Sequence, residues 1–107
     1  MKVGTIVQLK VACLENPIGS IGVVFYDYGF GSQAIFENGG YDGFSNVHRM
    51  PTIGQPIEED YFLDQIGFEP DLTGYEFKNV LQVEQDFRKG VFDVVLKRPY
   101  AITGRKT

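Results

Sequence analysis

The fold of this chain is decided by three stretches near its start, VGTIVQLKV (residues 3–11), GSIGVVFYDYG (19–29) and GSQAIFENGGYDGF (31–44). Each stretch is rich in Val, Ile and aromatic residues and is interrupted by Gly or Asn-Gly. Such runs are typical of antiparallel strands that are joined by short turns. We therefore expect one strand in each of the first two stretches and two strands in the third.

The first two strands differ in their patterns. Residues 3–11 alternate between apolar and polar positions, which predicts a strand with one buried face. Residues 20–28 are apolar on both faces, as in a central strand or a strongly bent barrel strand. Because these strands follow one another closely in a chain of 107 residues, we expect a small SH3-like antiparallel β-barrel or a strongly bent sheet.

The third strand, at residues 32–38, leads into a short fourth strand at residues 41–45. Between them lies Asn38-Gly39, the strongest short hairpin signal in the chain. A type I′ turn needs positive φ at both central positions, which Asn and Gly tolerate. The sequence therefore predicts a two-residue turn at this point.

The second half of the chain predicts two short helices. Pro56 followed by acidic residues is typical of a helix start, and Gly67 would end that helix. Asn79 with Gln82 three residues later resembles a capping box, and Gly90 would end the second helix.

Two further segments have weaker patterns. Residues 75–77 are expected to form a strand, and residues 91–97 fit either a strand or a helix. The sequence thus indicates an α+β fold with two short helices in its C-terminal half. The expected organisation is one domain over residues 1–102, β-rich at 3–50 and mixed at 56–97, with a disordered tail at 103–107.

Part of the β-rich half resembles a known family of small barrels. Gly4-Thr5-Ile6-Val7, the turn at Asn16, and the stretch at residues 19–24 look like the opening of SH3-like barrels of the KOW type. The resemblance covers about residues 3–45. It implies an SH3-like fold and an RNA- or ribosome-associated role. KOW segments that bind RNA carry Lys or Arg around this turn, whereas this chain has Glu15.

Charge is distributed unevenly along the chain. Residues 11–87 hold thirteen acidic residues and two basic ones, a net charge of −11, whereas residues 88–107 carry +5. An acidic body argues against nucleic-acid binding, which needs a basic face to neutralise phosphates. The basic segment could bind acidic partners or lie against the acidic body.

Several features indicate a cytoplasmic protein. The first residues have no apolar stretch that ends in small residues, so we expect no signal peptide, and no apolar run predicts a membrane span. Cys13 is the sole cysteine, so no internal disulfide can form and a reducing compartment is expected. Between Ala12 and Leu14, this cysteine is expected to be buried and unreactive.

Motifs for catalysis and cofactor binding are weak. Gly29-x-Gly31-x-x-Ala34 matches the loose dinucleotide fingerprint, but a predicted strand follows it, where the fingerprint needs a helix. His48 could serve as a general base, although local sequence places no acidic partner beside it. Hence we expect no cofactor, and a structural role for this histidine.

A cluster of acids near residue 60 could in principle bind a hard cation. The spacing lacks the D-x-D-x-D-G pattern of calcium loops, and complementarity to a helix dipole explains these acids more simply. We therefore expect no metal site. The acids are Glu58, Glu59, Asp60 and Asp64.

The best candidate for a binding surface is a set of aromatic and acidic side chains along two adjacent hairpins. Flat apolar rings beside carboxylates suit a proline-rich or basic peptide. The alternative is that these rings fill the core, since aromatic residues make up much of any small core. We expect Tyr28 and Tyr41 to be the most exposed. The candidate ligand-binding residues are Tyr26, Tyr28, Phe30, Tyr41, Asp27 and Asp42.

The function favoured by the sequence is a non-enzymatic protein-interaction module, an adaptor or regulator, whose partner is an unknown protein or peptide. One alternative is a small enzyme that uses His48 with a carboxylate. Another is an RNA- or ribosome-associated barrel that uses basic residues. The sequence leaves the oligomeric state open. The basic residues of the last alternative are Lys2, Lys10, Lys97 and Arg98.

Overall fold

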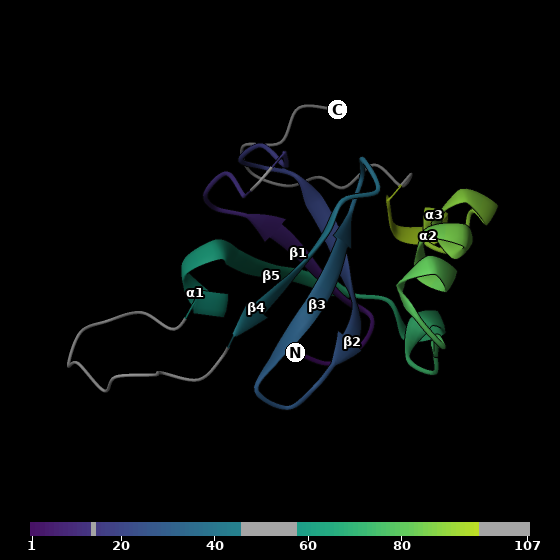
Figure 1. Ribbon diagram of the computed structural model, residues 1–107. Helices are drawn as coiled ribbons and strands as arrows, with labels where there is room; N and C mark the ends of the chain where they lie inside the picture. Colours follow the sequence, from purple (N-terminus) through teal and green to yellow (C-terminus); the bar gives the residue numbers. More distant parts are fainter. Residues whose placement is uncertain (14, 46–57, 97–107) are drawn as a thin grey trace.

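A computed structural model describes residues 1–13, 15–45 and 58–96 of the chain (Figure 1). The fold is α+β, with one five-stranded antiparallel sheet of strand order β4-β3-β2-β1-β5. The strands are β1 (Thr5–Leu9), β2 (Ile21–Asp27), β3 (Gly31–Phe36), β4 (Tyr41–Ser45) and β5 (Leu63–Phe68). The helices are α1 (Glu58–Phe62), the 3-10 helix η1 (Pro70–Leu72), α2 (Val80–Lys89) and α3 (Asp93–Leu96).

The sheet is open, so the expected closure into a barrel is wrong. β4 and β5 are the two edge strands, separated by β3, β2 and β1. A barrel would need these two edges to pair with each other. Of the two predicted forms, a barrel or a strongly bent sheet, the structure agrees with an antiparallel sheet that does not close.

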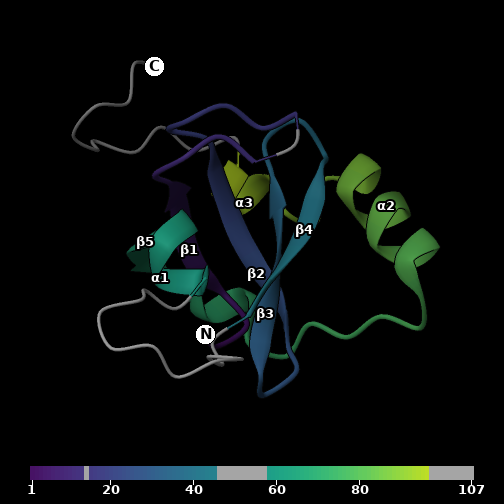
Figure 2. The same ribbon diagram turned by 60° about the vertical axis from the view of Figure 1, so that its left-hand side comes forward.

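Two hydrophobic cores form on opposite faces of the sheet, with α2 and α3 on one side and α1 on the other (Figure 2). The first core, on the side of α2 and α3, contains Ile6, Ile21, Val23, Phe25, Ile35, Leu72, Val83, Phe92, Val95 and Leu96. The second core contains Val7, Leu9, Val24, Ala34, Phe36, Phe44 and Leu63.

β1 is buried on both faces, which corrects the expectation of one buried face. The reason is its place in the sheet, since β2 and β5 flank it and a core covers each face. Gln8, a polar residue of β1, is accommodated by a hydrogen bond from its Nε2 to the Gly19 carbonyl at 3.3 Å. β2, predicted to be a central strand, is confirmed as one.

The helix that was predicted to end at Gly67 is only partly correct. α1 ends at Phe62, and the chain continues directly as β5. Gly67 is therefore no helix cap but a strand residue that pairs with Ile6. Pairing with β1 overrides the local helical pattern here, because the ladder of backbone hydrogen bonds forms only in the extended conformation. Pro56 lies outside the described residues.

The second predicted helix is confirmed as α2. Its N-cap Asn79 accepts a hydrogen bond from the Gln82 N–H at 2.9 Å, and its C-cap Gly90 has the left-handed φ of 88°. In a regular capping box the Gln82 side chain would accept a hydrogen bond from the N–H of the N-cap residue, Asn79. Here its Oε1 accepts instead from the N–H of the preceding residue, Lys78, at 2.9 Å. The segment at residues 91–97, which fitted either structure, contains the helix α3 up to Leu96.

Residues 75–77, expected to form a strand, form neither a helix nor a strand and pair with no strand of the described residues. This short segment links η1 to α2 along the face that holds the first core. Among the described helices, none is long and apolar enough to cross a membrane.

Asn38-Gly39 does form a hairpin turn, but the loop has three residues, not two. Phe36 and Gly40 close the loop through a hydrogen bond from the Phe36 N–H to the Gly40 carbonyl at 2.8 Å. The Gly39 N–H donates to the Phe36 carbonyl at 2.8 Å, and Gly39 has a φ of 87°. This arrangement is typical of a three-residue hairpin with a glycine bulge.

We predict that Gly39→Ala lowers the free energy of unfolding by about 1 kcal/mol or more, because a side chain disfavours positive φ. The added Cβ would also lie 3.1 Å from the Phe87 ring. Gly43→Ala is the matched control, since its Cβ would meet no atom closer than 3.7 Å. Urea denaturation measures both variants, and equal effects would contradict the assigned turn.

Candidate functional site

The candidate site is an aromatic cleft at the end of β2. Tyr26 packs edge-to-face on Phe77, with ring centroids 5.5 Å apart and an interplanar angle of 86°. The Tyr28 ring also contacts Tyr26, with a centroid distance of 6.0 Å. Tyr26 and Tyr28 come from one hairpin, whereas Phe77 comes from the segment between η1 and α2.

A β-bulge in β2 explains why Tyr26 lies on this face. The register between β2 and β3 shifts between Val24 and Tyr26. In a bulge, two residues on one strand oppose one residue on its partner, which re-aims a side chain. Phe25 and Tyr26, although consecutive, therefore both contact the Phe77 ring. Regular alternation would place Tyr26 on the face opposite to Phe25. The bulge instead brings Tyr26 into the same aromatic cluster as Phe25.

The cleft has a volume of about 490 Å³, in the range of small-ligand and peptide pockets. Its rim is accessible, since 43% of Tyr26 is exposed. Aromatic rings form its walls, and an amide, a carboxylate and an ammonium group provide polar contacts. The lining residues are Tyr26, Gln33, Tyr75, Glu76, Phe77 and Lys78.

Tyr75 fixes the far wall of the cleft. Its ring stacks with Phe77, at a centroid distance of 6.0 Å and an angle of 24°, and also contacts Phe92 at 5.1 Å. The Tyr75 hydroxyl donates to the Asp86 Oδ2 at 2.7 Å. Burial raises the pKa of Tyr75 strongly, and the hydrogen bond and negative charge of Asp86 raise it further. This ring is thus held between α2 and the core in its neutral form.

The predicted aromatic residues do not all gather in the cleft. Tyr26 lines the cleft and Tyr28 contacts Tyr26, but Tyr41 packs on Phe25, with a centroid distance of 6.3 Å. Burial and Glu84, which accepts a hydrogen bond from the Tyr41 hydroxyl at 3.4 Å, raise the pKa of Tyr41. Phe30, which is 70% exposed, lies in the turn after β2.

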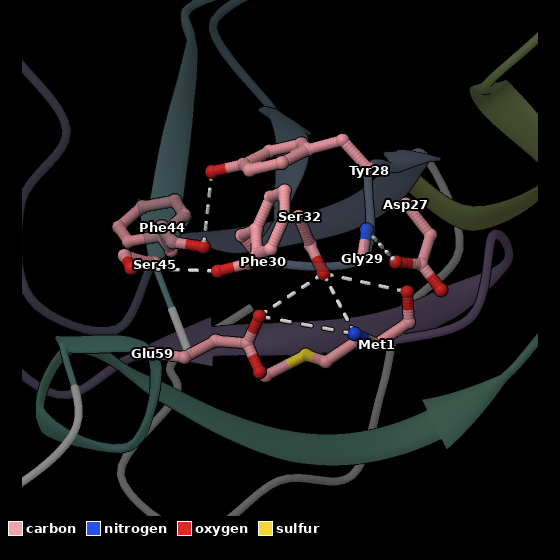
Figure 3. A network of polar contacts seen from close by, with 9 residues as sticks. All are labelled: Met1, Asp27, Tyr28, Gly29, Phe30, Ser32, Phe44, Ser45 and Glu59. Atoms are coloured by element: carbon pink, nitrogen blue, oxygen red, sulfur yellow. Dashed lines mark hydrogen bonds and ion pairs between the residues drawn. The ribbon is translucent and has the colours of Figure 1, made fainter. Parts of the chain in front are cut away.

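The expectation that Tyr28 and Tyr41 are the most exposed is wrong. Both rings are partly buried, and Tyr26 and Phe30 are the more exposed members of the set. The Tyr28 ring reaches over the β3–β4 hairpin, and its hydroxyl lies 3.4 Å from the Phe44 carbonyl oxygen, to which it donates (Figure 3). Tyr28 can do so because Gly31 leaves space, since a Cβ there would lie 2.6 Å from the hydroxyl.

The two predicted acids also lie away from the cleft. Asp27 and Tyr28 point to opposite sides of the hairpin (Figure 3), because consecutive strand residues alternate between faces. The Asp27 Oδ1 accepts a hydrogen bond from the Gly29 N–H at 2.9 Å. Asp42 lies beside Cys13, whose Sγ is 3.1 Å from the Asp42 Oδ2. The acid of the cleft is Glu76, which the sequence did not single out.

Cys13 is partly buried, so the expectation of full burial is wrong. It lies in a tight connection after β1, where its backbone exchanges two hydrogen bonds with Asn16. In the dinucleotide fingerprint at residues 29–34, Gly29 lies in the turn between β2 and β3 and Gly31 is the first residue of β3, so a strand follows the glycines, as expected.

A buried polar network holds the start of the chain and α1 against β3 (Figure 3). The Met1 ammonium group donates to the Ser32 Oγ at 2.7 Å, and the Ser32 hydroxyl donates to the Glu59 Oε2 at 3.0 Å. Glu59 also lies 3.8 Å from the ammonium nitrogen. Ser32 is fully buried and Glu59 is 7% exposed, so this network stabilises the fold and offers no accessible nucleophile.

The acids near residue 60 have different roles. Glu59 belongs to the buried network, and Asp64 lies 3.5 Å from the Lys10 Nζ. Within residues 1–13, 15–45 and 58–96, no group of three or more potential ligands could hold a metal ion. His48, Lys97 and Arg98, on which the two alternative functions depend, lie outside the described residues.

Tyr75 and Phe77 were missed as site residues because residues 75–77 were interpreted as a strand. The alternation Tyr75-x-Phe77 was a usable signal, since it places two rings on one side of an extended segment. Their contact with Tyr26 depends on how the chain returns across the sheet, which no local pattern encodes.

No protein-family model, curated protein or solved structure matches this chain.

We predict that alkaline pH destabilises the fold through Tyr75. The pKa of Tyr75 is raised in the folded state. The stability that neutral Tyr75 contributes is therefore fully present below the unfolded-state pKa of about 10 and is lost as pH rises above it. Tyr75→Phe should therefore lose less stability than the wild type above this pH in urea denaturation. Tyr61→Phe, at an exposed position of α1, should behave like the wild type, and parallel profiles for all three proteins would contradict the assignment.

We predict that Glu59→Gln lowers the free energy of unfolding by about 1–3 kcal/mol, because a buried ammonium group would lose its charged partner. Asp60→Asn is the matched control at the next position, where the side chain is exposed. Thermal and urea denaturation measure both variants. Equal stability of the two variants would show that the network contributes little.

Proposed function

We propose that this protein is a non-enzymatic, cytoplasmic protein-interaction module, an adaptor or regulator, whose aromatic cleft binds an extended segment of a partner protein. The observation that carries the proposal is the accessible Tyr26 ring, paired with Phe77 at the rim of a cleft of about 490 Å³. Exposed tyrosines beside a cleft are typical of binding hot spots, because they supply contact area at low entropic cost.

The chemistry of the lining favours a proline-containing segment. Polyproline II helices dock between aromatic rings, and their exposed carbonyls accept hydrogen bonds. Tyr26, Tyr75 and Phe77 provide the rings. Gln33 and Lys78 can donate to peptide carbonyls, and Glu76 can accept from a basic residue beside the proline.

The resemblance of residues 3–45 to KOW-type SH3-like domains supports a binding role, since these small β domains are commonly scaffolds for recognition. We do not extend the resemblance to RNA. Glu15 lies exposed in the connection between β1 and β2, where a nucleic-acid-binding member carries basic residues.

The test is a titration of the ¹⁵N-labelled protein with a decaproline peptide and with a peptide that combines proline and arginine. We expect the amide shifts to cluster around Tyr26, Gln33 and Phe77. Tyr26→Ala should weaken binding by roughly tenfold or more, as loss of a hot-spot aromatic residue does.

Tyr61→Ala is the matched control, because Tyr61 is also an exposed tyrosine but belongs to α1 on the other side of the sheet. Circular dichroism checks that both variants stay folded. The proposal is wrong if neither peptide shifts the cleft, or if Tyr61→Ala reduces binding as much as Tyr26→Ala does.

A further inference from the structure

We propose that a second pocket, at the opposite end of β2 from the aromatic cleft, binds a positively charged group with N–H donors, an alkylammonium or a guanidinium. This Asn16 pocket lies where the β1–β2 connection meets the β3–β4 hairpin and has a volume of about 430 Å³. It is separate from the cleft of the proposed function. Its lining residues are Glu15, Asn16, Asn38, Gly39, Gly40 and Tyr41.

The decisive feature is the side chain of Asn16. Only 4% of this residue is exposed, and its Oδ1 is the single buried side-chain polar atom of the described residues that has no hydrogen-bond partner. Leaving a buried acceptor unpaired is costly, and most such groups in folded proteins are paired. Asn16 lines the pocket, so a donor bound there would lie beside this amide.

The backbone fixes Asn16 in this position. Its N–H donates to the Cys13 carbonyl at 2.9 Å, and its own carbonyl accepts from the Cys13 N–H at 3.0 Å. Pro17 follows and limits the backbone further. These contacts fix the backbone from which the buried Asn16 side chain extends.

The opposite wall belongs to the β3–β4 hairpin. The Asn38 Oδ1 accepts a hydrogen bond from the Gly40 N–H at 2.8 Å, which fixes the second amide. A Cβ at Gly40 would lie 3.0 Å from the Asn38 Oδ1 and 3.2 Å from the Asn16 Nδ2. Glycine at this position thus keeps open the space between the two amides.

The charge of the lining determines the kind of donor. Glu15 contributes an exposed carboxylate, and none of the six lining residues is basic. The Tyr41 hydroxyl is directed to Glu84, so it donates away from the Asn16 Oδ1. A carbonyl acceptor inside and a carboxylate at the mouth suit a cation that donates hydrogen bonds, and they disfavour an anion.

The same charged group could come from a free amine or from a Lys or Arg side chain of a partner. Three probes distinguish these sources: agmatine, the tripeptide acetyl-Gly-Arg-Gly-amide, and its citrulline analogue, which is neutral. Titration of the ¹⁵N-labelled protein follows the Asn16 side-chain amide and the backbone amides of Gly39 and Gly40. We expect these signals to shift with the charged probes and to change little with citrulline.

Tighter binding of agmatine than of the arginine tripeptide would indicate a free amine, and the reverse order would indicate a partner side chain. Either order supports the pocket. Absence of binding by both charged probes, or equal binding of the citrulline peptide, would overturn the proposal and indicate that the pocket holds only water.

Variants test the role of the Asn16 acceptor. Asn16→Leu removes the acceptor at similar volume and should weaken binding of the charged probes roughly tenfold. Asn16→Asp keeps an acceptor, adds negative charge and should strengthen binding. Binding that is unchanged in Asn16→Leu and not strengthened in Asn16→Asp would overturn the assignment.

Two further variants keep the test decisive. Gly40→Ala narrows the space between the two amides without altering Asn16 itself, so it should weaken binding even if Asn16→Leu does not fold. Tyr61→Ala, at an exposed position of α1 on the other side of the sheet, should leave binding of these probes unchanged. Wild-type affinity in Gly40→Ala, or a loss in Tyr61→Ala equal to that in Gly40→Ala, would contradict a site at Asn16.

Discussion

The antiparallel pairing of β5 with β1 is the contact on which the rest of the structure depends. It extends from Thr5–Phe68 to Leu9–Leu63, and backbone bonds continue it at both ends, from Glu69 to Gly4 and from Lys10 to Phe62. This pairing makes β1 an interior strand and brings the second half of the chain to the sheet. It also sends α1 and the later helices to opposite faces, which produces two cores.

The elements that the sequence predicted well are those that local chemistry encodes. The strands β2 to β4 are bounded by glycine turns, and α2 has a side-chain cap at Asn79 and a left-handed glycine at its end. β5 was not predictable in this way. Leu63 and Ile66 fit a helix as well as a strand, and only the presence of β1 beside them decides between the two.

The candidate site was predictable in part, for a related reason. Tyr26 and Tyr28 are close because they are close in sequence, but the third ring, Phe77, comes from a distant segment. A bulge after Val24 then places Phe25 and Tyr26 on one face, whereas simple alternation would separate them. For Asp27 and Asp42 the error is the opposite one. Their nearness in sequence to aromatic residues predicted that they would share a face with those rings, but the strand geometry places both acids elsewhere.

The two polar clusters of this small domain differ in a way that bears on their roles. In the network of Met1, Ser32 and Glu59, the ammonium group and the hydroxyl both donate to acceptors inside the protein, and neither Ser32 nor Glu59 has a buried side-chain polar atom without a partner. At Asn16 the backbone is fully engaged while the side-chain oxygen is buried without a donor. A satisfied buried network rigidifies a fold, whereas an unpaired acceptor on a residue that lines a cavity retains hydrogen-bonding capacity. Of the two clusters, Asn16 is therefore the one for which we propose a ligand.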